Sequence, residues 1–332
     1  MVSLKRIWLD KDPKAKNQWL NLMNKSSLNP TNEKIDYTVG IFDGDRLVAT
    51  GSYDNNIIKC VAVCKDYKSE NLLTQILINL LERMREEGKE HFLVYTKPAN
   101  EAIFASLGFH KIIGNNQVIF MEQGFPDFND YEKMLKSEKK TGSASGIVMN
   151  ANPFTKGHQY LVETAAAQSE HVYIFVVSED VSYFSTEDRL AMVKLGVSHL
   201  DNVTVLPTNS YMVSSATFPS YFLKEDAELD VASTQAKLDA QLFKDKIAKD
   251  LNITKRYVGE EPYSEVTEIY NKSMSEVFGS DLELDIIPRI DSKGDVISAT
   301  KVRKAIAEGD DELLHRFLPD TTYDYLQKHN KL

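Results

Sequence analysis

The order of apolar runs and turn signals differs between the two halves of the chain. Up to about residue 125, short apolar segments alternate with turn residues, and Asp43-Gly44-Asp45 has the composition of a tight hairpin turn. One longer segment carries apolar residues at helical spacing and ends just before Gly88. The pattern predicts strands at Tyr37–Phe42, Arg46–Tyr53, Ile57–Val63 and His91–Tyr95, and helices at Leu72–Arg85 and Ala99–Leu107.

After about residue 143 apolar strands alternate regularly with amphipathic helices. Such βαβα alternation predicts a parallel sheet with helices on both of its faces. Thr186 has the character of an N-cap for one of these helices, and Tyr211–Asp250 is long enough to be a helical insertion. The predicted strands are Ser145–Met149, Val172–Val177, Val203–Leu206, Arg256–Val258 and Leu282–Ile287, and the predicted helices are Gly157–Ser169, Thr186–Gly196, Ala299–Glu308 and Asp311–Phe317.

The boundary between the two patterns is a polar, highly charged stretch that ends in Thr141-Gly142-Ser143. A chain of 332 residues exceeds what one hydrophobic core usually holds, so two domains are expected. We predict an N-terminal domain over residues 1–128, a linker over 129–143 and a C-terminal domain over 144–332. The expected fold class is α/β, with an α+β N-terminal domain followed by a parallel-sheet domain of Rossmann-like type.

The composition indicates a soluble globular protein of acidic surface. Hydrophobic residues make up 42% and charged residues 27%, and the formal net charge is −10. This balance argues against non-specific nucleic-acid binding, which needs a positive face. The segment that follows Met1 has no apolar leader, and no stretch approaches the length needed to span a bilayer, so we expect a cytoplasmic protein. Cys60 and Cys64 are expected to be reduced thiols.

The segment most informative about chemistry joins the first strand of the second domain to its first helix. It reads GIVMNANPFTKGH from Gly146 to His158, so a strand delivers a loop to the edge where open α/β sheets bind ligands. The following helix start presents unpaired N–H groups to an anion, and Gly157 permits close approach of the backbone. Thr155 and His158 supply donors that can stabilise charge on phosphate oxygens. Within this segment the predicted catalytic residues are Thr155, Lys156 and His158, and the predicted nucleotide-binding residues are Asn150, Asn152, Phe154 and Gly157.

A second segment has the same character near the end of the chain. Ile297-Ser298-Ala299-Thr300 precedes a helix whose first turn carries Arg303. Ser298 or Thr300 can cap that helix, and an arginine fork suits phosphate oxygens. Neither a Walker A loop nor a GxGxxG motif occurs, and no metal-ligand cluster is predicted.

Weaker candidates follow other strands of the second domain. Gly259 and Glu260 could line an adenine or acyl pocket, or form an ordinary turn after a strand. Ser178-Glu179-Asp180 could be a site or a solvated loop. Arg189 could reach a phosphate or form a surface ion pair, whereas His171 and His199 are expected at the surface.

Together, the (H/T)xGH sequence and the later ISxTxxR sequence resemble the nucleotidylyltransferase superfamily. More narrowly, strings such as GIVMNANPFTKGHQYLVETAA, FVVSEDVSYFSTEDRLAMVK and IPRIDSKGDVISATKVR resemble citrate lyase ligases. The resemblance implies ATP-dependent transfer of acetate to the thiol prosthetic group of the citrate lyase acyl carrier protein, with release of AMP and diphosphate. It implies that Thr155 and His158 contact the ATP phosphates and that Ser298, Thr300 and Arg303 bind the triphosphate. ATP and Mg²⁺ are the expected cofactors, with no nucleic-acid or membrane partner.

The first domain is similar to GNAT acetyltransferases in its hairpin, its strand IIKCVAVC and its late Ala102–Phe109 segment. Asn71 and Leu73 stand where acetyl-CoA-binding members carry glycines, and their side chains crowd the backbone cradle for a pyrophosphate. The resemblance therefore implies a role in docking the carrier or holding its pantetheine-like arm. A purely structural domain is the alternative.

Three other functions fit parts of this pattern. They are a pantetheine-phosphate or nicotinamide-mononucleotide adenylyltransferase, a nucleotide-binding regulator without turnover, and an active N-acetyltransferase. The ligase prediction requires His158 and Arg303 to face a single pocket. Their placement on opposite sides of the molecule would remove its basis.

Overall fold

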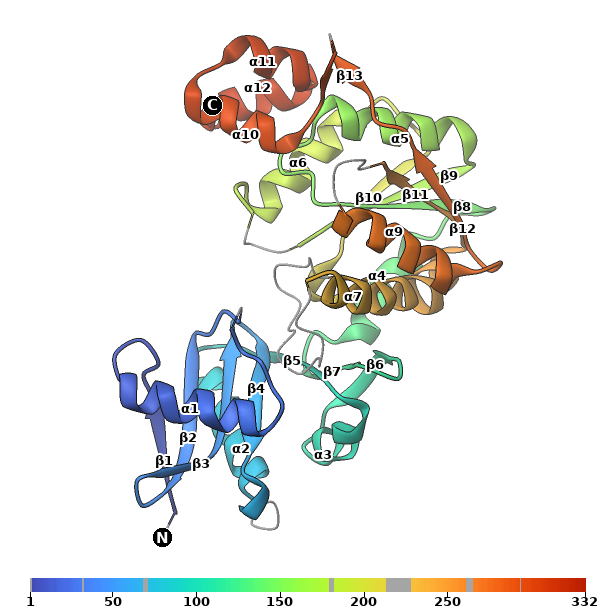
Figure 1. The fold of residues 1–332 in the computed structure, drawn as a ribbon. Coiled ribbons are helices and arrows are strands. Elements are labelled where there is room, and N and C mark those ends of the chain that lie inside the picture. Colours follow the sequence, from blue (N-terminus) through green and yellow to red (C-terminus); the bar gives the residue numbers. More distant parts are fainter. Residues whose placement is uncertain are drawn as a thin grey trace. The chain divides into compact units, whose positions relative to one another are not determined.

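The computed structural model describes residues 2–31, 33–67, 71–178, 182–212, 228–260, 265–292 and 294–332 (Figure 1). The chain divides into two compact units, one formed by Met1–Asp130 and Phe218–Leu238, the other by Tyr131–Thr217 and Asp239–Leu332. No helix in the described ranges has the length and apolar character needed to cross a membrane.

The first unit is built on a mixed seven-stranded sheet in the order β1-β2-β3-β4-β5-β7-β6. Its core gathers apolar side chains of the sheet, among them Val39, Tyr53 and Val94, around the buried stripe of the helix Leu72–Glu86. The strands are β1 (Val2–Ile7), β2 (Tyr37–Asp43), β3 (Arg46–Asp54), β4 (Ile57–Val63), β5 (His91–Thr96), β6 (His110–Gly114) and β7 (Ile119–Gly124), and the helices are α1 (Pro13–Lys25), α2 (Leu72–Glu86) and α3 (Glu101–Ser106).

The second unit is built on an all-parallel five-stranded sheet in the order β10-β9-β8-β11-β12, so β8 lies at its centre. With the mixed sheet of the first unit, this confirms the predicted α/β fold class. The strands are β8 (Ala144–Met149), β9 (His171–Val176), β10 (Val203–Pro207), β11 (Ile253–Gly259) and β12 (Glu283–Ile287), with a small pair of strands β13 (Asp291–Ser292) and β14 (Asp295–Val296).

Helices cover both faces of the parallel sheet, which explains why β8 and β9 are buried in nearly every position. On one face Ile147, Ile174 and Tyr257 enter a core with α5 and α6. On the other face Phe175 packs edge-on against Phe243, which follows α7. The helices outside the first sheet are α4 (Phe128–Ser137), α5 (Lys156–Gln168), α6 (Thr186–Gly196), α7 (Glu228–Leu242), α8 (Ala248–Leu251), α9 (Glu265–Phe278), α10 (Ala299–Glu308), α11 (Asp311–Phe317) and α12 (Asp320–Lys328).

The C-terminal helices α10 to α12 form a group beside α6 (Figure 1). Asp188, in the first turn of α6, accepts hydrogen bonds from Tyr325 of α12 (2.9 Å) and from Lys331. Burial alone raises the pKa of the Asp188 carboxyl. The hydrogen bonds from Lys331, Ser185 and Tyr325 outweigh burial and lower this pKa to about 2. An ionised, buried carboxylate therefore anchors the end of the chain to α6.

Several elements differ from the sequence-based expectations. Residues 129–143, predicted as a linker, include most of α4, whose Tyr131 and Leu135 are buried. The amphipathic pattern of that segment was masked by its many charges. The N-cap of α6 is Ser185, which accepts a hydrogen bond from the Asp188 N–H, rather than Thr186. The strand β1 and helix α1 were not predicted, and part of the predicted insertion Tyr211–Asp250 lies outside the described residues.

Candidate active site

A cavity of about 430 Å³ opens at the carboxyl edge of the parallel sheet. Its walls come from the ends of β8, β11 and β12 and from the starts of α5 and α10. Both sequence motifs thus reach one cavity, and His158 and Arg303 face it together. The predicted site residues among its lining are Asn150, Asn152, Thr155, Gly157, His158, Gly259, Glu260, Ser298, Thr300 and Arg303.

The start of α5 is shaped by Thr155 and His158. Thr155 is the N-cap, and its Oγ1 accepts a hydrogen bond from the His158 N–H at 3.4 Å. In return the Thr155 N–H donates to His158 Nδ1 at 3.1 Å, which completes a reciprocal capping arrangement. Because Nδ1 accepts this bond, a neutral imidazole carries its proton on Nε2. His158 is therefore oriented as an N–H donor.

The protonation state of His158 follows from its surroundings. Burial lowers the pKa of the ring, and the nearby positive charge of Arg289 lowers it further, to about 4. A neutral Nε2–H at neutral pH can donate a hydrogen bond to a phosphate oxygen. The positive charge of this cavity is carried instead by Arg289 and Arg303.

We predict that His158 of the ligand-free protein keeps one neutral tautomer down to about pH 5, since its pKa is near 4 rather than about 6.5. The unfolded chain binds that proton first on acidification, so this residue's contribution to stability is unchanged above about pH 6.5 and falls as the pH drops toward 4. Long-range ¹⁵N–¹H NMR of the histidine rings measures both the tautomer and the midpoint. A His158 midpoint at the ordinary histidine value would contradict this electrostatic account.

The start of α10 forms the opposite wall of the cavity. Ser298 is the N-cap of α10, yet its side chain makes no capping hydrogen bond. Arg303 donates from Nη1 to the carbonyl oxygen of Asn152 (2.6 Å) and from Nη2 to Thr300 Oγ1 (3.0 Å). The Arg303 side chain thereby joins the second motif to the loop of the first.

Two glycines of the lining are not required by protein packing. A Cβ atom at Gly157 would meet its nearest neighbour, Thr155 Oγ1, at 3.5 Å, and a Cβ at Gly259 would meet nothing within 4 Å. A side chain at either position would therefore not clash with the rest of the protein. Their lack of side chains instead widens the cavity, as expected where a ligand approaches the backbone.

Arg289 is a candidate functional residue that sequence analysis missed. It follows β12 and lines the cavity, and its Nε donates to the Glu260 carbonyl oxygen at 2.8 Å. Neither of the two predicted phosphate-binding motifs includes it, although it lies within the string IPRIDSKGDVISATKVR. A further signal was its place just after a predicted strand, at the same edge of the sheet as the other site residues.

Two predicted site residues point elsewhere. Phe154 is fully buried in the core and lies against the last residue of α6, where a Cβ at Gly196 would come within 2.3 Å of its ring. Lys156 Nζ donates to the carbonyl oxygen of His315 at 2.9 Å, near the C-terminal end of α11. Neither lines the cavity. Their contacts hold the loop and the C-terminal helices in place.

Of the weaker candidates, Arg189, His171 and His199 do not line this cavity. Arg189 is fully buried and donates to the carbonyl oxygens of Phe184 and Asn150, so it does not lie at the surface. His171 is buried and lies 3.0 Å from Thr204 Oγ1, whereas His199 is exposed. Cys60 and Cys64 are free thiols. Of the segment Ser178-Glu179-Asp180, only Ser178 lies within the described residues.

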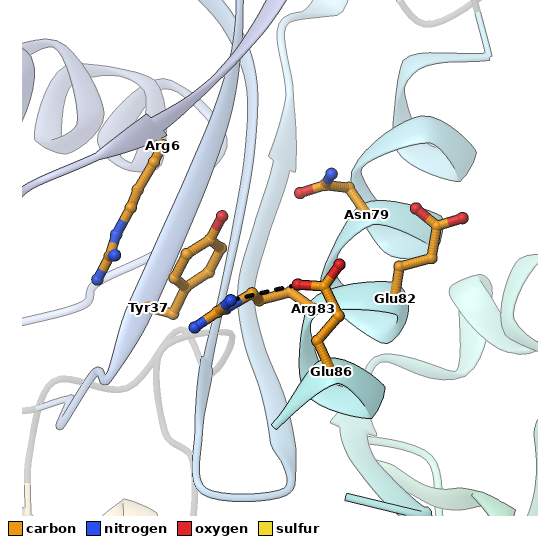
Figure 2. A pocket seen from close by; sticks show the side chains of 6 residues that line it. All are labelled: Arg6, Tyr37, Asn79, Glu82, Arg83 and Glu86. Atoms are coloured by element: carbon orange, nitrogen blue, oxygen red, sulfur yellow. Dashed lines mark hydrogen bonds and ion pairs between the residues drawn. The ribbon is translucent and has the colours of Figure 1, made fainter. Parts of the chain in front are cut away.

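Two other cavities lie in the first unit. One has a volume of about 330 Å³ and is lined by Arg6, Glu82, Arg83 and Glu86. Arg83 pairs with Glu86 at 3.2 Å, and Arg6 and Glu82 add one charge of each sign (Figure 2). A larger cavity of about 550 Å³ is lined by Lys25, Lys65 and Lys97, and no acidic side chain is among the described residues of its wall. The charges of the first cavity cancel, whereas the second is suited to an anion.

The larger cavity lies where β4 and β5 diverge. These parallel strands pair only at Ile57 with Leu93 and at Ile58 with Val94. Beyond those pairs, residues 61–63 of β4 and Thr96 of β5 line the cavity. At this end of β4, the backbone groups that face β5 are not paired with that strand. They can therefore form hydrogen bonds with a ligand that carries amide groups.

Comparison with known proteins gives matches over nearly the whole chain. A family profile described as the citrate lyase ligase C-terminal domain matches residues 144–326. A citrate (pro-3S)-lyase ligase of Haemophilus influenzae is 37% identical over 308 residues, which are 89% of this chain and 90% of the relative. Proteins of the same name from Klebsiella pneumoniae and Escherichia coli are 36% and 35% identical over 85% and 88% of this chain, and 84% and 86% of the relatives.

Solved structures resemble parts of the chain at low scores. An IAA acetyltransferase from Bacillus cereus has 16% identity and a TM-score of 0.30, and the match covers 38% of this chain and all of that one (100%). Thermotoga maritima TmcAL bound with alpha-thio ATP has 15% identity and a TM-score of 0.39, over 56% of each chain. Neither likeness carries an argument about activity.

Proposed function

Because this chain belongs to the citrate lyase ligase family, we propose that its cavity binds ATP and activates acetate as acetyl-adenylate. The acetyl group then passes to the thiol prosthetic group of the citrate lyase acyl carrier protein, with release of AMP and diphosphate. The relatives align along most of their length, so the chain is a ligase rather than an isolated nucleotide-binding domain.

The observation that carries the proposal is the meeting of two helix starts in one cavity. The N–H groups at the starts of α5 and α10 offer partial positive charge to anions, and Arg289 and Arg303 add full charges. Glu260 is the one carboxylate among the described lining residues. In a protein of net charge −10, such a local excess of donors fits a triphosphate.

In the first step, an oxygen of ionised acetate forms a bond to the α-phosphorus while the bond from that phosphorus to the bridging oxygen breaks and diphosphate leaves. Acetate needs no general base because it is already an anion at neutral pH. His158 Nε2–H and the Thr155 side chain donate to α-phosphate oxygens, and Ser298, Thr300 and Arg303 hold the departing diphosphate. These donors are fixed before reaction, which is where most of the rate enhancement of such transfers originates.

In the second step, the carrier thiolate attacks the acetyl carbon, a carbon–sulfur bond forms, and the bond to the AMP oxygen breaks. AMP leaves with that electron pair, and the thiol proton passes to solvent. The lysine-lined cavity of the first unit is suited to the phosphate and amide groups of the carrier arm. We assign the arm to this cavity, in agreement with the role implied by the replaced glycines at Asn71 and Leu73.

Magnesium ion fits the site as a companion of the nucleotide. No cluster of three or more metal-ligating side chains is found within the described part of the chain. Mg²⁺ commonly binds through substrate phosphates and water with few protein carboxylates. Glu260 is placed to contribute to such an ion, which would neutralise charge on the triphosphate.

The proposal is tested with the two half-reactions measured separately. Exchange of labelled diphosphate into ATP should require acetate and proceed without carrier, and AMP release should then require the carrier thiol. A phosphate monoester such as pantetheine phosphate should not replace acetate. Exchange that depends on such a monoester and ignores acetate would assign the chain to another adenylyl transfer.

A further inference from the structure

The buried Arg189 is tied to the loops around the candidate active site. Its side chain is completely buried and donates hydrogen bonds to oxygen acceptors. It donates to the carbonyl oxygens of Asn150 (3.2 Å) and Phe184 (3.1 Å), to that of Val177, and to Thr186 Oγ1 (2.9 Å). One guanidinium thus connects the end of β8, the end of β9 and the start of α6.

The same guanidinium fixes the orientation of the Asn150 side-chain amide. Arg189 Nη1 lies 2.8 Å from Asn150 Oδ1, and Ser182 Oγ lies 3.2 Å from the same oxygen. A guanidinium has only donors, so the atom of Asn150 that faces it must be the oxygen. The amide nitrogen Nδ2 donates to Ser182 Oγ at 3.2 Å and belongs to an exposed residue of the cavity wall. Asn150 consequently presents N–H rather than C=O to a ligand.

Asn150 lies on a different side of the cavity from the residues proposed to hold the triphosphate. It directly follows the central strand β8 and is tied to the segment after β9, whereas Gly259, Arg289 and Ser298 belong to the side of β11, β12 and α10. An in-line displacement requires the attacking oxygen to lie opposite the leaving diphosphate. A hydrogen-bond donor on the β9 side is therefore suited to bind the attacking carboxylate.

We infer that Asn150 Nδ2–H binds one oxygen of the substrate carboxylate and directs the other oxygen at the α-phosphorus, with Arg189 as the positioning residue. This inference rests on the proposed function and adds to it the residue that selects a carboxylate. An amide donor favours an anionic oxygen acceptor, and the locked orientation excludes the flipped amide, whose oxygen would repel a carboxylate.

The test is Asn150→Asp, which keeps the shape of the side chain and an oxygen for Arg189. It replaces the outward N–H by a carboxylate oxygen. In acetate-dependent exchange of diphosphate into ATP, the KM for acetate should rise by about 10- to 100-fold, the usual effect of losing a hydrogen bond to a charged group. The Kd of ATP, measured by calorimetry, should change much less. Asn55→Asp, at an exposed turn of the first unit, makes the same charge change as a matched control.

Arg189→Lys provides a second variant, because a lysine cannot hold three loops and orient the amide together. It should raise the KM for acetate in the same way, with folding checked by thermal unfolding; if it unfolds, Asn150→Asp decides alone. An unchanged KM for acetate in Asn150→Asp would overturn the inference. A loss confined to ATP binding would overturn it as well, because it would assign Asn150 to the nucleotide. Absence of acetate-dependent exchange in the unmodified enzyme would instead contradict the proposed function.

Discussion

Replacement of His158 by alanine is expected to reduce acetate-dependent diphosphate exchange by roughly 100- to 1,000-fold or more, close to abolition. The loss has two physical sources. The Nε2–H donor disappears, and the Thr155 N–H loses its acceptor Nδ1, so the start of α5 loses a capping bond. The measurement is the initial rate of label exchange between diphosphate and ATP at saturating acetate.

Two further variants separate these sources. His158→Gln restores an N–H donor near the position of Nε2 and should recover part of the activity. His199→Ala removes an exposed histidine that pairs with Glu163 at 3.0 Å and should exchange at the normal rate. Near-normal exchange in a folded His158→Ala protein would remove this residue from the mechanism.

Replacement of Arg303 by methionine is expected to lower kcat/KM for ATP by about 1,000-fold, comparable to removal of other arginines that act on transferring phosphoryl groups. Arg303 holds the Asn152 carbonyl oxygen at 2.6 Å and Thr300 Oγ1 at 3.0 Å, and we propose that it also contacts the triphosphate. Methionine preserves much of the apolar stem but none of these bonds. Steady-state kinetics with varied ATP measure the effect.

The controls for Arg303 lie on the same helix. Lys304→Met removes a positive charge whose side chain is 74% exposed and pairs with Glu308, so it should leave the kinetics unchanged. Arg303→Lys keeps the charge but offers no planar fork, and it should fall between methionine and the unmodified enzyme. Equal activity of Arg303→Met and Lys304→Met would contradict the proposed contact between Arg303 and the triphosphate.

The sequence predicted the parts of the fold and site that depend on local pattern. The strand, loop and helix from Gly146 through His158 form β8 and α5 nearly as expected, since apolar periodicity and a helix cap are local signals. Parallel strands end at one edge of their sheet, so the meeting of the two motifs follows from topology. The charged helix α4 was hidden because burial of Tyr131 depends on its partner Tyr211, which is distant in sequence.

The residues whose partners are distant in sequence could not be placed in advance. Phe154 lies within the first motif, yet its ring fills the space left by Gly196. The sequence leaves a phosphate contact or a surface ion pair open for Arg189, but this charged side chain is buried and donates to carbonyl oxygens from separate loops. Arg289 belongs to no motif, and only the geometry of β12 brings it beside His158.

The anchoring of the C-terminal helices by Asp188 has a consequence for synthesis in the cell. The first motif emerges from the ribosome long before Arg303 and before Lys331, which bonds to the Asp188 carboxylate. A growing polypeptide therefore carries the first motif while it still lacks Arg303, which lines the same cavity. The cavity is therefore complete only after α10 has been synthesised.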